Sequence, residues 1–125
     1  MRKTITIMLL AVSVMSHGQT IDEVRGEIIK QGLPCHEIVL AQARHETGNF
    51  KSRLCRANHN LFGIKHGKRY ARYPTWRHSV ADYKKRISAR YNGGRRDHNA
   101  YFAFLIRIGY AADKQYTSKL RKYLR

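Results

Sequence analysis

The segment from Pro34 to Thr47 constrains the fold of this 125-residue chain more than any other. Its middle, residues 38–43, is too apolar for a surface helix, and Gly48 is the kind of residue that ends a helix. We therefore expect a central, buried helix. Glu46 follows Gln42 by one turn on the same face, so this helix carries a carboxyl group to the rim of the core.

Position alone leaves two interpretations of Glu46. Apolar surroundings disfavour its ionised form, so the group can stay protonated long enough to act as a general acid. A surface carboxylate paired with one of the many arginines explains the position equally well. The His45-Glu46 pair also suggests a zinc protease, but Asn49 replaces the second histidine of H-E-x-x-H, and we expect no metal.

The N-terminus has the layout of a secretory signal peptide, in which Arg2 and Lys3 precede an apolar run that ends near Met15. We expect residues 1–19 to be removed, with cleavage near residues 18–20, which leaves one domain over residues 20–125. The alternative is a buried N-terminal helix. The apolar run is shorter than the roughly 20 residues that span a bilayer, so no transmembrane anchor is expected after cleavage. The predicted location is periplasmic or secreted.

The chain is strongly basic, with 25 Lys and Arg against 8 Asp and Glu and a formal charge of +17. Removing Arg2 and Lys3 leaves +15. Such a charge predicts attraction to a polyanion, which could be nucleic acid, an anionic membrane surface or a cell-wall polymer. Export makes a stable nucleic-acid partner unexpected. A solvated basic face with no partner is the other explanation.

Cys35 and Cys55 both lie in the part of the chain that we expect to leave the reducing cytosol, so we predict a disulfide between them. Closing a loop of this length stabilises a small domain by roughly 3 kcal/mol on the chain-entropy model. The bond would also staple the segment that carries Glu46. Neither cysteine sits in a signature of a catalytic thiol, and two cysteines alone are too few for a structural zinc site.

The remaining chain reads as mostly helical with one short extended region. Hydrophobic spacing and turn residues predict helices or helical turns at 21–30, 51–56, 79–91, 99–109 and 114–125, and extended segments at 58–65 and 68–76 around Gly67. Ser79 is the expected N-cap of the helix at 79–91, with Asp82 in its first turn. The predicted fold class is α+β, mostly α, with a small β-hairpin lobe.

The predicted hairpin carries the densest mixture of aromatic and basic residues in the chain. Its members are Tyr70, Tyr73 and Trp76, interleaved with Lys65, Lys68, Arg69, Arg72 and Arg77. Flat rings with polar neighbours can stack on sugars or on bases. Aromatics packed beneath the lobe, with basic tips outward, would give the same pattern.

Four segments of the chain resemble a known family. They are Ala41 to Gly48 (AQARHETG, against AQAxxESG), Asn60 to Lys65 (NLFGIK), Tyr73 to Tyr83, and Tyr110 to Tyr116 (YAADKQY, against YATDPxY). The same motifs occur, in this order, in bacterial autolysins and flagellar peptidoglycan hydrolases of the endo-β-N-acetylglucosaminidase class. Each motif is weak alone, but four in one order within one small domain form a strong signal.

The resemblance implies a lysozyme-like helical domain that binds peptidoglycan strands in a groove beside the hairpin lobe and cleaves a β-1,4 linkage. Glu46 is then the general acid. The residues implied in substrate binding are Gln42, Asn60, Phe62, Tyr73, Tyr110, Asp113 and Tyr116, while Gly63 shapes the floor of the groove. For Phe62 and Gly63 a purely structural role remains equally open. We expect a monomer without cofactors, attracted also to anionic cell-wall polymer.

One departure from the family pattern concerns the second carboxylate that common glycosidases use. The chain from Thr47 to Ala81 contains no acidic residue. Asp82 and Asp113 are the nearest candidates, but capping of helices explains both. We therefore expect a one-carboxylate site, in which the substrate's acetamido group or a sugar hydroxyl attacks. The latter would be a lytic transglycosylase-type reaction, and a wall-binding or polyanion-binding protein with a degenerate site is the non-catalytic alternative.

Overall fold

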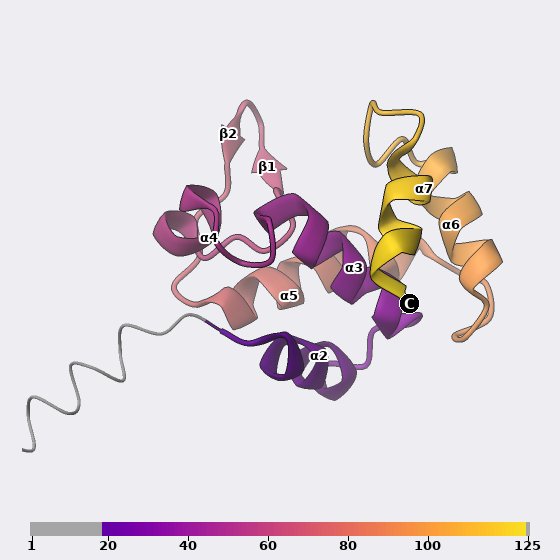
Figure 1. Ribbon diagram of the computed structural model, residues 1–125, viewed down its shortest axis with the longest axis horizontal. Coiled ribbons are helices and arrows are strands. Elements are labelled where there is room, and N and C mark those ends of the chain that lie inside the picture. Colours follow the sequence, from indigo (N-terminus) through magenta and orange to yellow (C-terminus); the bar gives the residue numbers. More distant parts are fainter. Residues whose placement is uncertain (1–18, 125) are drawn as a thin grey trace, which may run out of the picture.

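The computed structural model describes residues 19–124 (Figure 1). The predicted signal peptide, apart from Gln19, lies outside these residues. The elements are α2 (Ile21–Lys30), α3 (His36–Thr47), α4 (Arg53–Asn58), β1 (Lys65–His66), β2 (Arg69–Tyr70), α5 (Trp76–Arg86), η1 (Ser88–Arg90), α6 (His98–Arg107), α7 (Tyr116–Arg121) and η2 (Lys122–Leu124). The prediction of a mostly helical α+β domain with one small hairpin is confirmed. No helix within the described part of the chain is long and apolar enough to cross a membrane.

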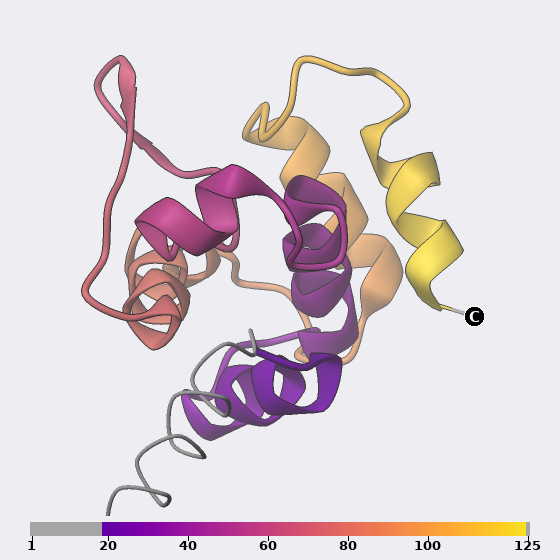
Figure 2. The same cartoon turned by 60° about the vertical axis from the view of Figure 1, so that its left-hand side comes forward.

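α3 is the central helix, as its apolar sequence predicts. Residues 38–43 and Thr47 are buried in it, and it ends at Gly48, whose φ of 57° is left-handed and whose N–H donates to the Arg44 carbonyl. Figures 1 and 2 show α2, α5, α6 and α7 packed around it. The core that they share with α3 includes Val24, Ile28, Val80, Tyr83, Tyr101, Phe104, Leu105 and Leu120.

α2 has the predicted bounds, and a capping box explains where it begins. The Thr20 hydroxyl accepts a hydrogen bond from the Glu23 N–H at 3.1 Å, and the Glu23 carboxylate accepts one from the Thr20 N–H at 2.8 Å. Two of the N–H groups that a helix leaves unsatisfied at its start are paired in this way. The buried side chains of Val24 and Ile28 then fix the helix on the core.

The hairpin is much shorter than the extended segments that the sequence predicts. Only Lys65↔Tyr70 and His66↔Arg69 pair as antiparallel strands. The buried side chain of Asn60 takes the place of a longer ladder. Its oxygen accepts from two N–H groups, those of Phe62 and Ile64, and its amide nitrogen donates to two carbonyls, those of Ile64 and Ala71.

α5 begins earlier than predicted, so the expected cap at Ser79 is wrong. The helix starts at Trp76 after Thr75, which places Ser79 inside it and Asp82 in its middle rather than in its first turn. The Ser79 hydroxyl is buried and donates to the Trp76 carbonyl at 2.7 Å, while it accepts from the Leu61 N–H. A serine that bonds the preceding turn and a neighbouring loop is compatible with a helix interior.

The predicted disulfide is absent, because Cys35 and Cys55 are free, buried thiols in separate places. Cys35 precedes the first residue of α3, and its sulfur faces the Gly94 and Asp97 carbonyls. Cys55 lies in α4 beyond the other end of α3, and accepts a hydrogen bond from the Gln19 side chain. Twelve helical residues span roughly 18 Å, which holds the two sulfurs apart.

Candidate active site

A groove of about 770 Å³ runs past Glu46 between the hairpin side and the chain that joins α6 to α7. In Figures 1 and 2 these two parts rise on opposite sides of α3. The lining residues are Glu46, Phe62, Gly63, Ile64, Lys65, Tyr70, Arg86, Ile87, Arg90, Ile108, Gly109, Tyr110, Ala111 and Ala112. Glu46 is thus the acidic residue on the wall of this groove.

The Glu46 carboxyl group is half-buried at the last turn of α3. Burial raises its pKa, and this effect outweighs the hydrogen bond from Tyr116 and the charge of His45, which both lower it. No ion pair within residues 19–124 involves Glu46, so it is not the arginine-paired surface carboxylate of the alternative interpretation. The group therefore holds its proton to higher pH than an ordinary glutamate, as a general acid requires.

Gly63 allows the loop before the hairpin to approach Glu46 closely. A Cβ at this position would lie 3.1 Å from Glu46 Oε1, and the φ of Gly63 is +65°. Both features favour glycine, because a side chain would be strained in this conformation and would displace the carboxyl group. The Asn60 hydrogen bonds described above hold the same loop, so Asn60 supports the site from within the core, where its side chain has no exposed surface.

Tyr116 connects Glu46 to a buried row of hydrogen bonds. The Tyr116 hydroxyl donates to Glu46 Oε2 at 2.9 Å, and Gln42 Nε2 donates to the Tyr116 hydroxyl at 3.3 Å. Gln42 Oε1 accepts in turn from the Tyr83 hydroxyl, which lies 2.7 Å from the hydroxyl of Tyr101. Because Tyr83 gives its proton to Gln42, Tyr101 must donate to Tyr83, and every bond in the row points toward Glu46.

This row changes how two predicted substrate-binding residues act. Gln42 is fully buried and Tyr116 is 6% exposed, so both lie behind Glu46 rather than on the groove. Burial raises the pKa of the Tyr116 hydroxyl, which keeps it a proton donor at neutral pH. Tyr83 and Tyr101 were not predicted as site residues. The available signal was that both tyrosines lie on apolar helix faces, where a buried hydroxyl needs a hydrogen-bond partner.

Tyr110 joins the floor of the groove to the opposite wall. Its hydroxyl donates to the Phe62 carbonyl at 3.1 Å, and its ring stacks on that of Tyr116 with centroids 5.6 Å apart. Phe62 packs on the buried ring of Tyr83, 4.4 Å away. Two of the residues that the family resemblance implies, Tyr110 and Phe62, therefore do line the groove together.

Asp82 is engaged in a different arrangement, away from the groove lining. Its carboxylate accepts from Tyr73 Oη at 2.6 Å, lies 2.9 Å from His66 Nε2, and pairs with Arg86 Nε at 2.8 Å. Burial by itself would raise the pKa of Asp82, but these hydrogen bonds outweigh it and lower the pKa. This cluster of four residues, the Asp82 clasp, ties both sides of the hairpin region to α5.

Asp113 lies on the surface rather than on the groove. It accepts a hydrogen bond from the Gln115 N–H at 2.9 Å and pairs with Lys119, so it organises the start of α7. Its side chain borders a separate hollow formed by residues of α6 and α7. The described residues contain no cluster of three His, Cys, Asp or Glu side chains arranged to hold a metal ion.

The aromatic and basic residues of the hairpin region lie in different environments. Tyr70 and Lys65 line the groove, whereas Tyr73 belongs to the Asp82 clasp. Trp76 is partly buried against the core, and the Arg77 guanidinium lies 4.3 Å from the centroid of the Trp76 ring. Only part of the predicted patch is therefore available to a ligand in the groove.

Comparisons with known proteins identify the family and the fold of the chain. The sequence profile of the family Glucosaminidase, described as mannosyl-glycoprotein endo-beta-N-acetylglucosaminidase, matches residues 23–125. The catalytic domain of the autolysin Auto from Listeria monocytogenes has a similar structure, with a TM-score of 0.65 and 22% sequence identity over 94% of this chain and 91% of that one. At this identity the likeness establishes a shared fold. No curated protein sequence matches the chain.

Proposed function

The chain belongs to the glucosaminidase family, and we propose that it is a peptidoglycan hydrolase that cleaves β-1,4 glycosidic bonds, of the N-acetylglucosaminidase type, with Glu46 as general acid. One observation carries the proposal. A half-buried carboxyl group with a raised pKa and no ion pair within residues 19–124 opens onto a long groove. Such a group suits proton donation, because burial disfavours its ionised form more than that of an ordinary glutamate.

The two oxygens of Glu46 have different surroundings, which supports a division of labour. Oε2 accepts the Tyr116 hydrogen bond, whereas Oε1 lies against Gly63. With Oε2 fixed as an acceptor, the proton of the neutral acid belongs on Oε1. In the reaction, Oε1–H donates to the glycosidic oxygen as the bond to the anomeric carbon breaks, and the leaving sugar departs as an alcohol.

The Asp82 clasp supports a one-carboxylate mechanism. Asp82 is held by three partners, Asp113 pairs with Lys119, and neither carboxylate lines the groove. The attacking group is then supplied by the substrate, as its acetamido oxygen or as a sugar hydroxyl. The first route ends in a reducing sugar after water enters, and the second ends in an anhydro sugar.

Peptidoglycan is the proposed substrate for three reasons. Four motifs resemble those of wall hydrolases, the fold is shared with the catalytic domain of a protein named an autolysin, and the chain is strongly cationic. The proposal includes export through residues 1–19 and action in the periplasm or outside the cell. A non-catalytic wall-binding protein is the second candidate, and it is favoured because Glu46 is the single acidic side chain among the described residues that line the groove.

Digestion of purified peptidoglycan by the purified mature protein tests the proposal. Mass spectrometry of the soluble fragments should reveal glycans that end in reducing N-acetylglucosamine, or anhydro sugars if a hydroxyl attacks. The Glu46→Gln variant, which keeps the size of the side chain but cannot donate the proton, is the control. No fragments from the wild type would favour the wall-binding candidate, and equal fragments from both proteins would remove Glu46 from the mechanism.

A further inference from the structure

The two walls of the groove differ in charge. The wall formed by the hairpin, α5 and η1 presents Lys65, Arg86 and Arg90, whereas residues 108–112 on the other wall carry no charge. We propose that the cationic wall binds a carboxylate of the glycan, so that the groove selects carboxylate-bearing strands over neutral ones. This inference rests on the proposed function, because it concerns the substrate of the same groove.

Arg86 is pre-positioned for this task. Its Nε binds Asp82 Oδ1 at 2.8 Å, yet its side chain remains 50% exposed. A guanidinium group has five N–H donors in a rigid plane, so one bond to Asp82 leaves donors for a second carboxylate. Arg90, at the end of η1, is exposed and lines the groove on the same wall. The two arginines together offer bidentate donors along one side of the groove.

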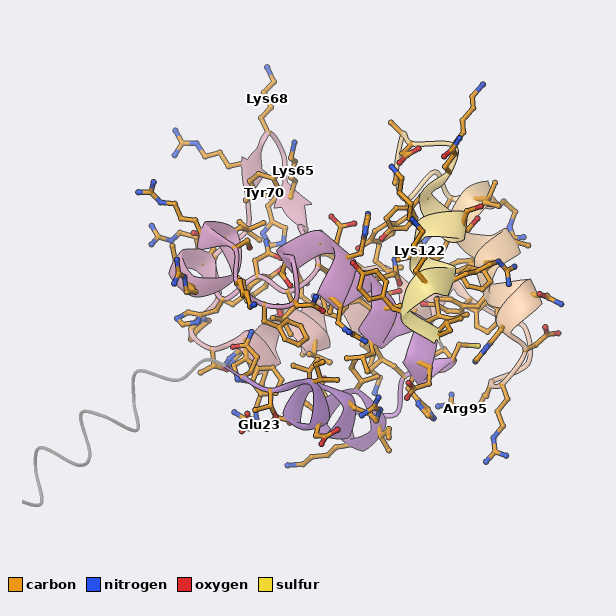
Figure 3. All side chains as sticks on the ribbon, viewed as in Figure 1. Glu23, Lys65, Lys68, Tyr70, Arg95 and Lys122 are labelled. Carbon is orange, nitrogen blue, oxygen red and sulfur yellow. The ribbon has the colours of Figure 1, made fainter. Side chains whose placement is uncertain are left out.

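Lys65 adds a third cation next to an aromatic ring. Lys65 and Tyr70 pair across the hairpin, and the Lys65 ammonium lies 5.0 Å from the centroid of the Tyr70 ring. Tyr70 is 48% exposed, although it is a large apolar side chain. A ring beside a cation suits a sugar that carries a negative charge, because the ring contacts the apolar face of the sugar and the ammonium pairs with the charge. Figure 3 shows Lys68, by contrast, at the hairpin tip and pointing away from the body of the protein.

The ligand chemistry that fits this wall is a carboxylate attached to a β-1,4 glycan. In peptidoglycan it has two sources. One is the lactyl group of muramic acid in strands without peptide, and the other is the peptide stem, which ends in carboxylates. A glycan built only of N-acetylglucosamine has neither. Glu46 is the acidic residue on the groove, and burial raises its pKa, so it opposes a bound carboxylate less than an ordinary glutamate would.

The test compares three substrates with the wild-type protein: peptide-free strands with free lactyl carboxylates, the same strands with those carboxylates reduced to alcohols, and peptide-bearing strands. We expect reduction to raise KM about tenfold with little change in kcat, since one charge-assisted contact contributes about that factor. Lys65→Gln and Arg90→Gln should each shrink this difference. Lys68→Gln, which removes the same charge from the hairpin outside the groove, should leave it unchanged.

The outcomes separate the two sources of carboxylate. Sensitivity of the peptide-free strands to Lys65→Gln and Arg90→Gln assigns the lactyl group, and sensitivity of only the peptide-bearing strands assigns the stem. Equal KM for free and reduced strands, together with no effect of either variant on peptide-bearing strands, overturns the inference. Equilibrium binding of the same three substrates to Glu46→Gln gives an independent readout. If the wild type cleaves nothing, the proposed function fails, while the binding preference still decides the carboxylate inference.

Discussion

Glu46 and Asp82 each accept a hydrogen bond from a tyrosine hydroxyl, yet their pKa values shift in opposite directions. At Glu46 the donor is Tyr116, and no ion pair among residues 19–124 involves the carboxylate, so burial outweighs the hydrogen bond and the charge of His45, and the pKa rises. At Asp82 the donor is Tyr73, and hydrogen bonds from His66 and Arg86 add to it, so the pKa falls. The tyrosine contact is common to both, so the opposite directions of the pKa shifts follow from the deeper burial of Glu46 and from the cationic partners of Asp82.

The largest expected effect is that of Glu46→Gln on turnover. Loss of a general acid should lower kcat by about 10²–10⁴-fold, because the amide cannot protonate the leaving oxygen. Kinetics on purified peptidoglycan would measure this loss. A variant that retains more than about a tenth of wild-type turnover would exclude Glu46 as the acid.

The same variant should not melt below the wild type at neutral pH. The pKa of Glu46 is raised in the folded state, so ionisation disfavours folding as pH rises from the ordinary glutamate pKa through the raised one. Glutamine removes that penalty. Thermal unfolding across this pH range should show the stability difference shift in favour of the variant as pH increases, and a large drop in Tm at neutral pH would contradict the assigned direction.

Asp82→Asn should have the reverse profile, with a large effect on stability and a small one on turnover. Removing the charge weakens three hydrogen bonds of a mostly buried carboxylate, which should lower stability by about 1–3 kcal/mol. Because the folded pKa of Asp82 is lowered, its stabilisation is present above the ordinary aspartate pKa and is lost as pH falls through the lowered one. The melting temperature of the variant should therefore depend less on pH on the acid side.

Turnover of Asp82→Asn, measured below its melting transition, should fall less than about tenfold, well short of the loss expected for a general acid. Asn at position 82 keeps the shape of the side chain, so the hairpin remains on α5. If this variant is as inactive as Glu46→Gln and melts like the wild type, the site uses two carboxylates and the contrast between Glu46 and Asp82 fails.

The sequence predicted the setting of Glu46 correctly, because that prediction depended only on residues close to it in the chain. The apolar run at residues 38–43 and Gly48 predicted α3, and with it the position of Glu46 at the rim of the core. The prediction for Asp82 was wrong in its structural setting, because Ser79 resembles an N-cap although its hydroxyl bonds the preceding turn inside α5. Local residue types indicate helix ends only when no neighbouring element competes for the same hydroxyl group.

The sequence did not predict which residues far apart in the chain contact each other. The export signal and an even number of cysteines made a bond between Cys35 and Cys55 reasonable, yet α3 holds the two thiols apart. Likewise, Gln42 shares the face of Glu46 on the helix, but tertiary packing turns that face into the core at Gln42. Its partners, Tyr83 and Tyr116, come from α5 and α7, and spacing within one helix contains no information about them.

Tyr116→Phe tests the tyrosine contact at Glu46 directly and should have a moderate effect. The hydrogen bond from Tyr116 lowers the pKa of Glu46, so its loss should raise that pKa further. A general acid must be protonated, and activity falls as pH rises through its pKa. The alkaline limb of the kcat profile should therefore move to higher pH in Tyr116→Phe. A limb that stays in place, or moves to lower pH, would show that Tyr116 does not set the acidity of Glu46.

Tyr83→Phe should have the smallest effect on the pH dependence of kcat, because Tyr83 reaches Glu46 only through Gln42 and Tyr116. The Tyr83 hydroxyl fixes the Gln42 amide so that its nitrogen faces Tyr116, and phenylalanine would release this amide while keeping the ring on Phe62. The Tyr83 hydroxyl also accepts from Tyr101, so two buried hydrogen bonds are lost, which should lower stability by about 1–3 kcal/mol.

Tyr91→Phe is the matched control, because its hydroxyl donates to the Gly94 carbonyl outside the row. Both variants remove one tyrosine hydroxyl, but only Tyr83→Phe should displace the alkaline limb of kcat, in the same direction as Tyr116→Phe and by less. The reason is that a weakened Gln42 contact leaves the Tyr116 hydroxyl less firmly aimed at Glu46. Identical pH profiles for the two variants would mean that the buried row ends functionally at Tyr116, and that the remaining tyrosines only stabilise the core.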